Sequence, residues 1–219
     1  MSDSTSQLAA GLAKLALALK QHEWATGEQT GLSPTQSQVL AVLASRDAAG
    51  MAVSHLATEL AVTQATVSDA ISALQRKGLV TKTRSEADAR VVLVQLTDAG
   101  TGQAGATAQW PDAMLSALSG LDAAERAVLT RVIIKTIRTM QVAGQIPVAR
   151  MCVTCNYFRP HAHTDADRPH HCALVNSPLG DGDLRLDCPE QVPAEASAQP
   201  RLWQLFIEGR PPAAPASTF

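Results

Sequence analysis

The chain has 219 residues, of which 46% are hydrophobic and 17% are charged, and its formal net charge is −2. This apolar content is sufficient for a folded core, and no apolar run approaches the roughly 18 residues that a membrane-spanning helix needs. The N-terminal MSDSTSQ lacks the charged and apolar parts of a signal peptide. We therefore expect a soluble, cytoplasmic protein, and the slightly negative net charge on its own argues against binding to nucleic acid.

Two helices are expected before residue 50. Residues 4–25 are rich in leucine and alanine over several turns. Residues 34–47 begin with Ser33 and Pro34 in the cap and first-turn positions of a helix. Both segments are therefore predicted to be helical.

A short third helix is predicted from Ser54, which can cap it. The apolar positions Leu56, Ala57 and Leu60 follow at the spacing of a helical stripe that packs on a core. A fourth helix begins almost at once, so the pair is joined by a tight turn.

Thr63 is predicted to cap this fourth helix, and Gly78 provides the left-handed conformation that ends it. Its buried positions are expected to be Val67, Ala70, Ile71 and Leu74. The opposite face carries mostly short polar side chains that can reach base edges in a major groove, namely Gln64, Thr66, Ser68, Asp69, Ser72, Gln75 and Arg76.

Two strands are expected after Gly78, because LVTKTR and VVLVQL alternate apolar and polar residues, and the intervening SEADAR is polar and prone to turn. Two short helices followed by a hairpin form the layout of a winged helix-turn-helix. The predicted fold class is mainly α with a small antiparallel β-wing, and the first functional hypothesis is binding to double-stranded DNA.

From about Leu32 to Met140 the chain resembles the MarR family of bacterial transcription factors. The resemblance is carried by LSPTQSQVLAVL, by LATELAVTQATVSDAISALQRKGLV, by Asp88 and Arg90 in the motif DAR, and by QLTDAG. It implies a DNA-binding regulator, in the first instance a repressor, and no enzymatic activity.

The resemblance also implies which residues meet DNA. The helix of residues 64–77 would enter the major groove, and Arg90 of the wing would lie in the adjacent minor groove, with Asp88 orienting it. Phosphate contacts would come from Lys77, Lys82 and Arg84. The candidate contacts are thus Gln64, Ala65, Thr66, Ser68, Asp69, Ser72, Arg76, Lys77, Lys82, Arg84 and Arg90.

The local charge supports this hypothesis better than the net charge does. From Arg76 to Arg90 there are five basic residues and two acidic ones. Asp69 and Glu86 nevertheless place negative charge close to the expected DNA face. Nonspecific affinity should therefore be modest, and specificity must depend on base contacts and dimer geometry.

Two further helices are expected after the wing. Thr97 is predicted to cap a helix over about residues 98–118, which Pro111 should split or kink. Asp122 and Glu125 form a capping-box pattern before an apolar stripe. This stripe comprises Leu129, Val132, Ile133, Ile137 and Met140. The resemblance implies that the terminal helices pack against a second copy, so a homodimer would bind a palindromic operator.

The composition changes after Gly144, because all four cysteines and four of the six histidines lie between Cys152 and Cys188. The spacing is C-x2-C-x16-C-x15-C, followed by proline. A reducing cytosol disfavours disulfides, so clustered thiols indicate metal or redox chemistry. Inert cysteines and a simple redox dithiol are the weaker alternatives, since this polar segment offers little core and lacks a βαβ context.

An iron-sulfur cluster is favoured over zinc. A structural zinc ribbon normally supplies two C-x2-C pairs, whereas a Cys-Pro ending is familiar from ferredoxin-type sites. The expected ligands are Cys152, Cys155, Cys172 and Cys188. His170 and His171, and less readily His161 and His163, could replace a cysteine as ligands. A histidine in a polar loop is more often exposed to solvent, so none of them is assigned as a ligand.

The function predicted from the sequence is a homodimeric regulator whose DNA binding responds to redox or iron status through this site. The alternative is a regulator that answers a small aromatic ligand and whose cysteines hold structural zinc. A zinc deaminase is disfavoured, because the chain has no H-x-E motif.

Five segments are predicted. They are an N-terminal dimerisation helix (1–31), the winged helix-turn-helix (32–100), C-terminal dimerisation helices (101–145), a Cys/His-rich segment (146–192) and a largely disordered tail (193–219). Within the tail, the apolar RLWQLFIEG is expected to dock on the domain as a short strand or turn.

Overall fold

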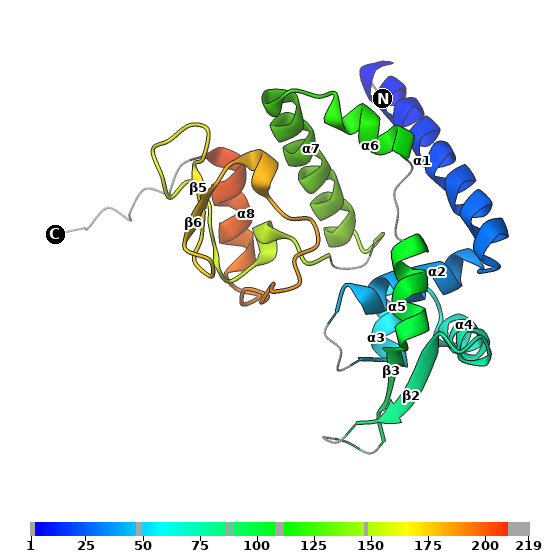
Figure 1. Ribbon diagram of the computed structural model, residues 1–219. Helices are drawn as coiled ribbons and strands as arrows, with labels where there is room; N and C mark the ends of the chain where they lie inside the picture. The colour runs from blue at the N-terminus through cyan, green and yellow to red at the C-terminus, as the bar shows by residue number, and fades with distance from the viewer. Residues whose placement is uncertain are drawn as a thin grey trace. The chain divides into compact units, whose positions relative to one another are not determined.

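The computed structural model describes residues 3–46, 50–85, 88, 90–107, 112–146 and 149–209 of the chain. The chain divides into two compact units, Met1–Ala117 and Leu118–Phe219 (Figure 1). The division falls within helix α6 (Asp112–Ser119). None of the described helices combines the length and apolar character that a membrane crossing requires.

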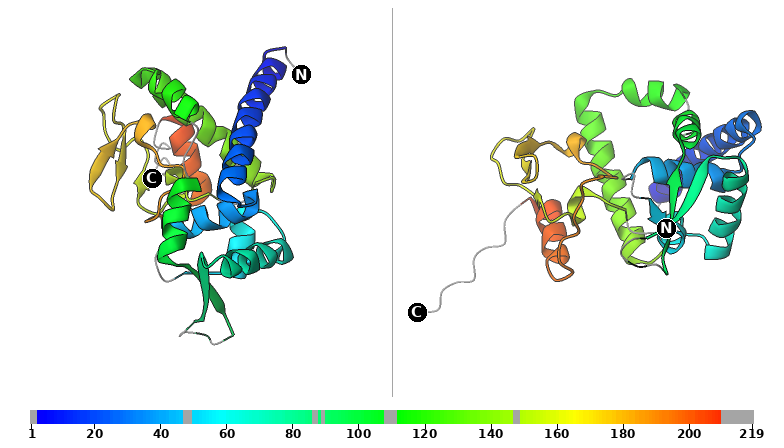
Figure 2. Two further views of the ribbon diagram at one scale, coloured as in Figure 1. Left: turned by 45° about the vertical axis from the view of Figure 1, so that its right-hand side comes forward. Right: turned by 60° about the horizontal axis from the view of Figure 1, so that its bottom comes forward.

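The first unit contains several helices and a three-stranded antiparallel sheet. The helices are α1 (Asp3–Thr30), α2 (Pro34–Ala44), α3 (Val53–Leu60), α4 (Gln64–Arg76) and α5 (Asp98–Thr107). Strand β3 (Val92–Leu96) lies between β1 (Met51–Ala52) and β2 (Val80–Arg84). The β2–β3 hairpin extends away from the helices of this unit (Figures 1 and 2). The predicted mainly α fold with a winged helix-turn-helix is confirmed.

Several predicted caps are present. Ser33 forms a capping box with Gln36 at the start of α2. The Thr63 hydroxyl accepts a hydrogen bond from the backbone N–H of Thr66, and Gly78 follows α4 with φ of 71°. The Thr97 hydroxyl accepts from the N–H of Gly100 at 2.9 Å. Since a Cβ at Gly100 would collide with the backbone oxygen of Leu79, only glycine allows α5 to start this close to the strand.

The cap predicted at Ser54 is wrong. Helix α3 begins at Val53, its N-cap is Ala52, and no side chain caps it. The physical reason is the short strand β1, which the sequence analysis did not predict. Because Ala52 pairs with Leu93 of β3, the chain enters the helix directly from the sheet.

The core of the first unit is built from the faces that the sequence predicted for α3 and α4. Leu56 and Ala57 of α3 are buried, while Leu60 is only partly buried. All four predicted positions of α4 are buried, namely Val67, Ala70, Ile71 and Leu74. They pack with α2 and the sheet, so the polar face of α4 is left outside.

Helix α1 differs from the others of its unit because none of its residues is buried. Its large apolar side chains are more than half exposed, and they are Leu8, Leu12, Leu15, Leu17 and Trp24. A long helix in water gains most of its stability from a packed apolar face. This surface therefore lacks a partner within the described part of a single chain.

The second unit combines two helices with a small sheet. Helix α7 (Ala123–Val142) comes first in the chain, and helix α8 (Gln199–Glu208) comes last. Between them in sequence lie the strands of an antiparallel sheet, β4 (Phe158–Arg159), β5 (His170–Cys172) and β6 (Ser177–Leu179), with β5 in the middle. Two 3-10 turns, η1 (Cys152–Thr154) and η2 (Asp181–Asp183), complete it. The predicted Asp122–Glu125 capping box opens α7, with both hydrogen bonds at 2.8 Å.

This unit has a hydrophobic core of its own, contrary to the expectation that the polar Cys/His-rich segment offers little core. The buried members are Ile134, Met151, Val153, Cys155, Phe158, Leu184 and Phe206. The predicted docking of RLWQLFIEG is present, but the segment forms helix α8 rather than a strand or turn, and it packs into this core through the fully buried Phe206. An apolar helical stripe within a Pro/Ala-rich stretch explains the difference. Residues 210–219 lie outside the described residues.

Helix α7 has two apolar faces, of which the sequence analysis recognised one. The core-facing residue is Ile134, which was not on the predicted stripe. Ile133 and Ile137 of that stripe are partly buried. Leu129, Val132 and Met140 are instead exposed. The predicted stripe is therefore mainly a surface of the second unit, and a neighbouring face forms the core.

Candidate functional site

Helix α4 presents a polar face to solvent because its apolar positions are turned into the core. The exposed residues of this face are Gln64, Ala65, Thr66, Ser68, Asp69 and Arg76. At its start the hydroxyls of Thr63 and Thr66 lie 2.9 Å apart, which orders the first turn. The structure thus brings these predicted contacts together on one helix surface.

Two other predicted contacts are engaged within the protein. Ser72 is partly buried, and its hydroxyl donates to the backbone oxygen of Ser68 at 2.8 Å. The Lys77 ammonium group donates to the backbone oxygen of Gly31 and to Oε1 of Gln36. Lys77 therefore ties the end of α4 to the turn between α1 and α2, and a phosphate contact would compete with these bonds.

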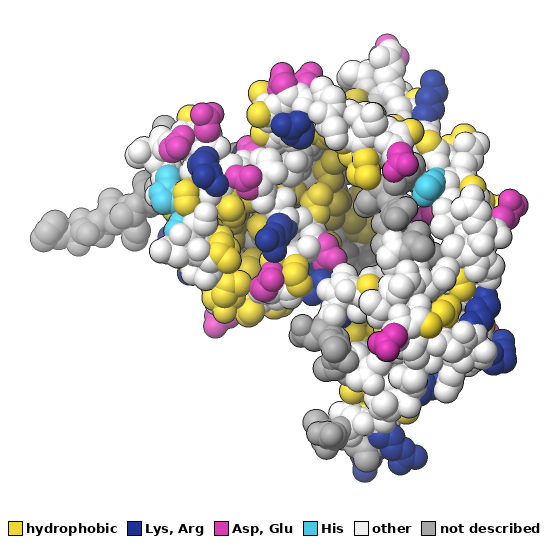
Figure 3. Space-filling view, in the orientation of Figure 1, with side chains coloured by type: hydrophobic (Ala, Val, Ile, Leu, Met, Phe, Trp, Pro, Cys, Tyr) yellow, Lys and Arg dark blue, Asp and Glu magenta, His cyan; other side chains and the backbone are white. Residues whose placement is uncertain are grey.

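Basic side chains gather on the wing. Lys82 and Arg84 on β2 and Arg90 beyond it are exposed. The Asp88 carboxylate accepts a hydrogen bond from the backbone N–H of Arg90 at 2.9 Å, so it orders the backbone that carries Arg90. In Figure 3, Lys and Arg side chains mark the end of the hairpin. This is the local positive potential that phosphate contacts require.

One acidic residue lies on the polar face of α4. Asp69 is exposed there. A carboxylate repels phosphate, but it can accept a hydrogen bond from the amino group of cytosine in the major groove. Asp69 therefore suits a base contact better than a backbone contact. Glu86, the other acidic residue noted in the sequence, lies outside the described residues.

All four cysteines are free thiols, and they border one cavity of about 30 Å³ in the second unit. They come from η1 (Cys152), the residue after it (Cys155), the end of β5 (Cys172) and the loop after η2 (Cys188). The other lining residues are Tyr157, Phe158, Leu174, Leu179 and Glu190. The fold therefore brings together the whole predicted ligand set around a space about twice that needed by one water molecule.

Polar groups of a single loop contact two of the sulfur atoms. The backbone N–H of Arg185 donates to Sγ of Cys152 at 3.3 Å. The Arg185 guanidinium lies 3.8 Å from Sγ of Cys188, whose thiol donates to Glu190 at 3.3 Å. Arg185 also forms an ion pair with Glu190. N–H donors aimed at sulfur stabilise the thiolate form that binds metal.

Burial raises the pKa of Cys152 to about 11, and the neighbouring thiols contribute in the same direction. The pKa of Cys188 is also raised, chiefly by burial and then by its hydrogen bond to Glu190. Thiols of this kind stay protonated at neutral pH unless a cation takes the place of the proton. Over the described ranges, no group of three or more His, Cys, Asp or Glu side chains meets the geometry of a metal-ion site.

The histidines of this segment do not line the cysteine cavity. His163 is exposed, and its Nε2 lies 3.2 Å from Nδ1 of the partly buried His171. His170 is fully buried, so the expectation that these histidines are exposed is wrong for it. Its environment is a polar network that the sequence analysis missed, because it joins residues far apart in the chain.

Asp181 of η2 is the centre of this network. It lies 2.9 Å from Nε2 of His170 and 3.2 Å from the guanidinium of Arg131 on α7. Burial acts to raise the pKa of Asp181, but the hydrogen bond to His170 and the charge of Arg131 outweigh it, and the pKa is lowered. The carboxylate is therefore the form that the fold prefers.

Ionised Asp181 is expected to stabilise the second unit above its ordinary pKa of 3.8, and this contribution should be lost as the pH falls below 3.8 through the lowered pKa of the folded state. The Asp181→Asn variant should therefore show a smaller loss of stability on acidification than the wild type. Urea unfolding at a series of pH values measures this, with the exposed Asp165→Asn as control. Parallel acid profiles for Asp181→Asn and the wild type would contradict the expectation.

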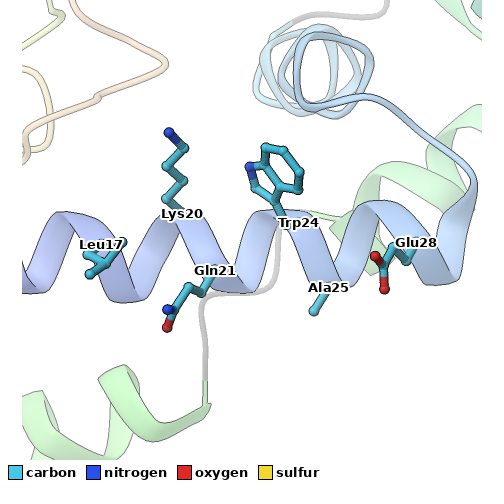
Figure 4. Close-up of a pocket in the computed structure, with 6 residues that line it drawn as sticks. All are labelled: Leu17, Lys20, Gln21, Trp24, Ala25 and Glu28. Atoms are coloured by element: carbon cyan, nitrogen blue, oxygen red, sulfur yellow. The ribbon is translucent and has the colours of Figure 1, made fainter.

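A groove runs along one side of α1 in the first unit. It is lined by Leu17, Lys20, Gln21, Trp24, Ala25 and Glu28. Lys20 and Trp24 point to the same side of the helix (Figure 4). All the lining residues belong to one helix, so the groove is a side of α1 rather than an enclosed pocket.

Comparison with known proteins agrees with this geometry. Residues 30–91 match the family model described as MarR family. A MarR family protein from Bacillus stearothermophilus has a similar fold, with a TM-score of 0.55 and 23% identity over 64% of this chain and 99% of that one. The S. aureus MepR-DNA complex gives a TM-score of 0.52 and 23% identity over 60% of this chain and 96% of that one. No curated protein matches the chain. Residues 30–91 are therefore similar in sequence to the MarR family, and the fold resembles that of solved proteins with a winged helix-turn-helix.

Proposed function

We propose that the chain is a transcription regulator that binds double-stranded operator DNA. The observation that carries the proposal is the exposed polar face of α4 beside the basic β2–β3 hairpin. In this proposal α4 enters the major groove, Arg90 reaches the minor groove, and Lys82 and Arg84 contact phosphate. A complex with DNA among the proteins of similar fold supports it.

The proposed assembly is a homodimer that recognises a palindromic site and represses transcription. The exposed apolar residues of α1 support it, and so do those of α7, where Val128 and Val132 are more than half exposed. Apolar patches of this kind usually mark an interface. A two-fold dimer presents two copies of α4 about one turn of DNA apart, which explains why the operator would be palindromic.

Selection from a pool of random duplexes tests the DNA-binding proposal without knowledge of the operator. The full-length protein should enrich one palindromic sequence, and its affinity for that sequence should fall steeply as salt is raised. Sedimentation of the complex should give two chains per duplex. Recovery of unrelated sequences, with no enrichment over a pool taken through without protein, would refute sequence-specific binding.

For the second unit, we propose that the four cysteines hold an iron-sulfur cluster, with zinc as the competing occupant. The shared cavity and the N–H group aimed at Cys152 support a thiolate-bound group. The bound group would alter operator affinity according to redox or iron status. A purely structural zinc site, with a small aromatic molecule as the signal, is the alternative.

Substitution of Cys155 by serine is expected to abolish stoichiometric metal binding. Cys155 borders the cavity and is buried, so the remaining three thiols would leave one position without a soft donor. Anaerobic purification followed by iron, sulfide and zinc analysis and a visible spectrum measures this for both proteins. Brown wild-type protein that contains iron and sulfide supports the cluster, and colourless protein with one zinc per chain supports the alternative.

The Ser177→Ala exchange on strand β6 serves as control, since the partly buried Ser177 faces Cys172 across the β5–β6 ladder but does not line the cavity. It should keep the wild-type metal content. Wild-type protein free of iron and zinc after anaerobic purification would exclude both forms of the proposal.

A further inference from the structure

Helix α7 is joined to the cysteine-bearing sheet by three polar side chains. The Asp181 carboxylate of η2 contacts both of the others. It accepts a hydrogen bond from the Arg131 guanidinium of α7 at 3.2 Å, and it lies 2.9 Å from Nε2 of His170 on β5. Nδ1 of His170 accepts the backbone N–H of His161 at 3.1 Å, so Nε2 is the nitrogen that carries the proton and donates to Asp181. Each group is thus oriented by the next.

Arg131 also forms hydrogen bonds with helix α8. Its second terminal nitrogen donates to the backbone oxygens of Phe206 and Ile207, at 2.7 and 3.2 Å. Its guanidinium carbon lies 4.5 Å from the centre of the Phe206 ring. A planar guanidinium can donate hydrogen bonds to a carboxylate and to the backbone oxygens at a helix C-terminus while it stacks on an aromatic ring. An apolar side chain of the same length can do none of this except pack on the ring. Arg131 therefore links α7 to both η2 and α8.

The other end of the network leads to the cysteine cavity. His170 and Cys172 lie on the same three-residue strand, β5. On the paired strand β6, Leu179 faces His170 in the ladder, lines the cavity and lies two residues before Asp181. A change in the position of Cys172 must therefore move the strand that carries His170 and the strand that leads into Asp181.

We infer that the Arg131–Asp181–His170 network couples the occupancy of the four-cysteine site to the position of α7. This inference rests on the proposed regulatory function, and it names the route by which that site reaches the helix whose exposed face belongs to the proposed dimer. When the site is filled, Cys172 is held and the network keeps α7 in one position against η2 and α8. When the site is empty, the strands relax and α7 shifts. Packed interfaces of this kind switch between discrete arrangements.

Operator affinity in two states of the protein tests the inference. Full-length protein reconstituted anaerobically with ferrous iron and sulfide is compared with the same protein after chelation. Coupling between two sites typically changes affinity by about 5- to 150-fold, and we expect a ratio in this range for the wild type. Arg131→Met should bind the same amount of iron and sulfide as the wild type. The ratio of its operator affinities in the reconstituted and chelated states should nevertheless fall to about 1. Lys135→Met, an exposed position on α7, should keep the wild-type ratio.

A second variant and a second measurement distinguish loss of the coupling from loss of folding. Asp181→Asn keeps an acceptor for His170 but removes the charge that Arg131 contacts, so it should lower the ratio even if Arg131→Met does not fold. Amide hydrogen exchange over residues 123–142 should differ between filled and empty wild type and not between filled and empty Asp181→Asn.

A wild-type affinity ratio above 5 that both variants retain would overturn the network while leaving the proposed function intact. If the wild type has equal operator affinity in the filled and empty states, with no difference in hydrogen exchange over α7, both the network and the proposed regulation by the cysteine site would be overturned.

Discussion

Removal of the Arg90 side chain is expected to weaken operator binding by about 10-fold or more, while leaving the stability of the protein unchanged. Arg90 is exposed, and its backbone N–H donates to the Asp88 carboxylate. A specific contact to a base edge contributes about 1–3 kcal/mol, and a dimer loses two such contacts on one operator. The loss should be largest for operators with A·T-rich sequence at the wing, where a narrow minor groove attracts a guanidinium.

Two matched variants separate this role from general electrostatics. Arg84→Ala, on β2, should weaken binding to all sequences alike and lower the slope of affinity against salt by about one ion for each lost phosphate contact. Arg201→Ala removes the same charge from an exposed position on α8 in the second unit. Fluorescence anisotropy with labelled duplex measures all three. Equal losses for Arg90→Ala and Arg201→Ala would show that the wing makes no specific contact.

The first unit could be predicted in detail because its core follows local rules. The buried positions of α4 repeat at helical spacing between a capping threonine and a glycine, so Val67 and Ile71 could be assigned to the core from neighbouring residues alone. The hairpin strands were equally clear from their alternation. The error at Ser54 has a non-local cause, because Ala52 pairs with a strand some 40 residues later in the chain.

The second unit was predicted less well for the same physical reason. Helix α7 carries apolar residues on two faces, and composition alone does not tell which one meets α8 and which is exposed. The ligand set was readable from cysteine spacing, and the structure places all four cysteines at one cavity. The contacts of Arg131 with Asp181 and Phe206 span 50 and 75 positions, so no local pattern indicates them.

The docking of RLWQLFIEG was predicted but its helical form was not, because its apolar residues lie in a stretch rich in proline and alanine, which is typical of disordered segments. Its stability depends on partners elsewhere in the chain. Phe206 is fully buried against Phe158 and His170, with ring centres 6.2 and 5.6 Å away, and it also lies 5.8 Å from Trp203 of its own helix. The stability of this helix therefore depends on its packing against aromatic and apolar residues from distant parts of the chain.

Phe206→Ala is expected to lower the free energy of unfolding of the second unit by about 3–5 kcal/mol, because it removes a buried aromatic side chain and leaves a cavity. The backbone oxygen of Phe206 that accepts from Arg131 is unchanged, so the loss reports the packing of the ring together with its contact with the Arg131 guanidinium. Urea unfolding followed by circular dichroism measures it. Leu202→Ala, at a partly buried position of the same helix, is the control and should cost clearly less. An unfolding midpoint for Phe206→Ala equal to that of the control would mean that α8 does not belong to the core, and the contacts of Arg131 with α8 would then no longer support the Arg131–Asp181–His170 network.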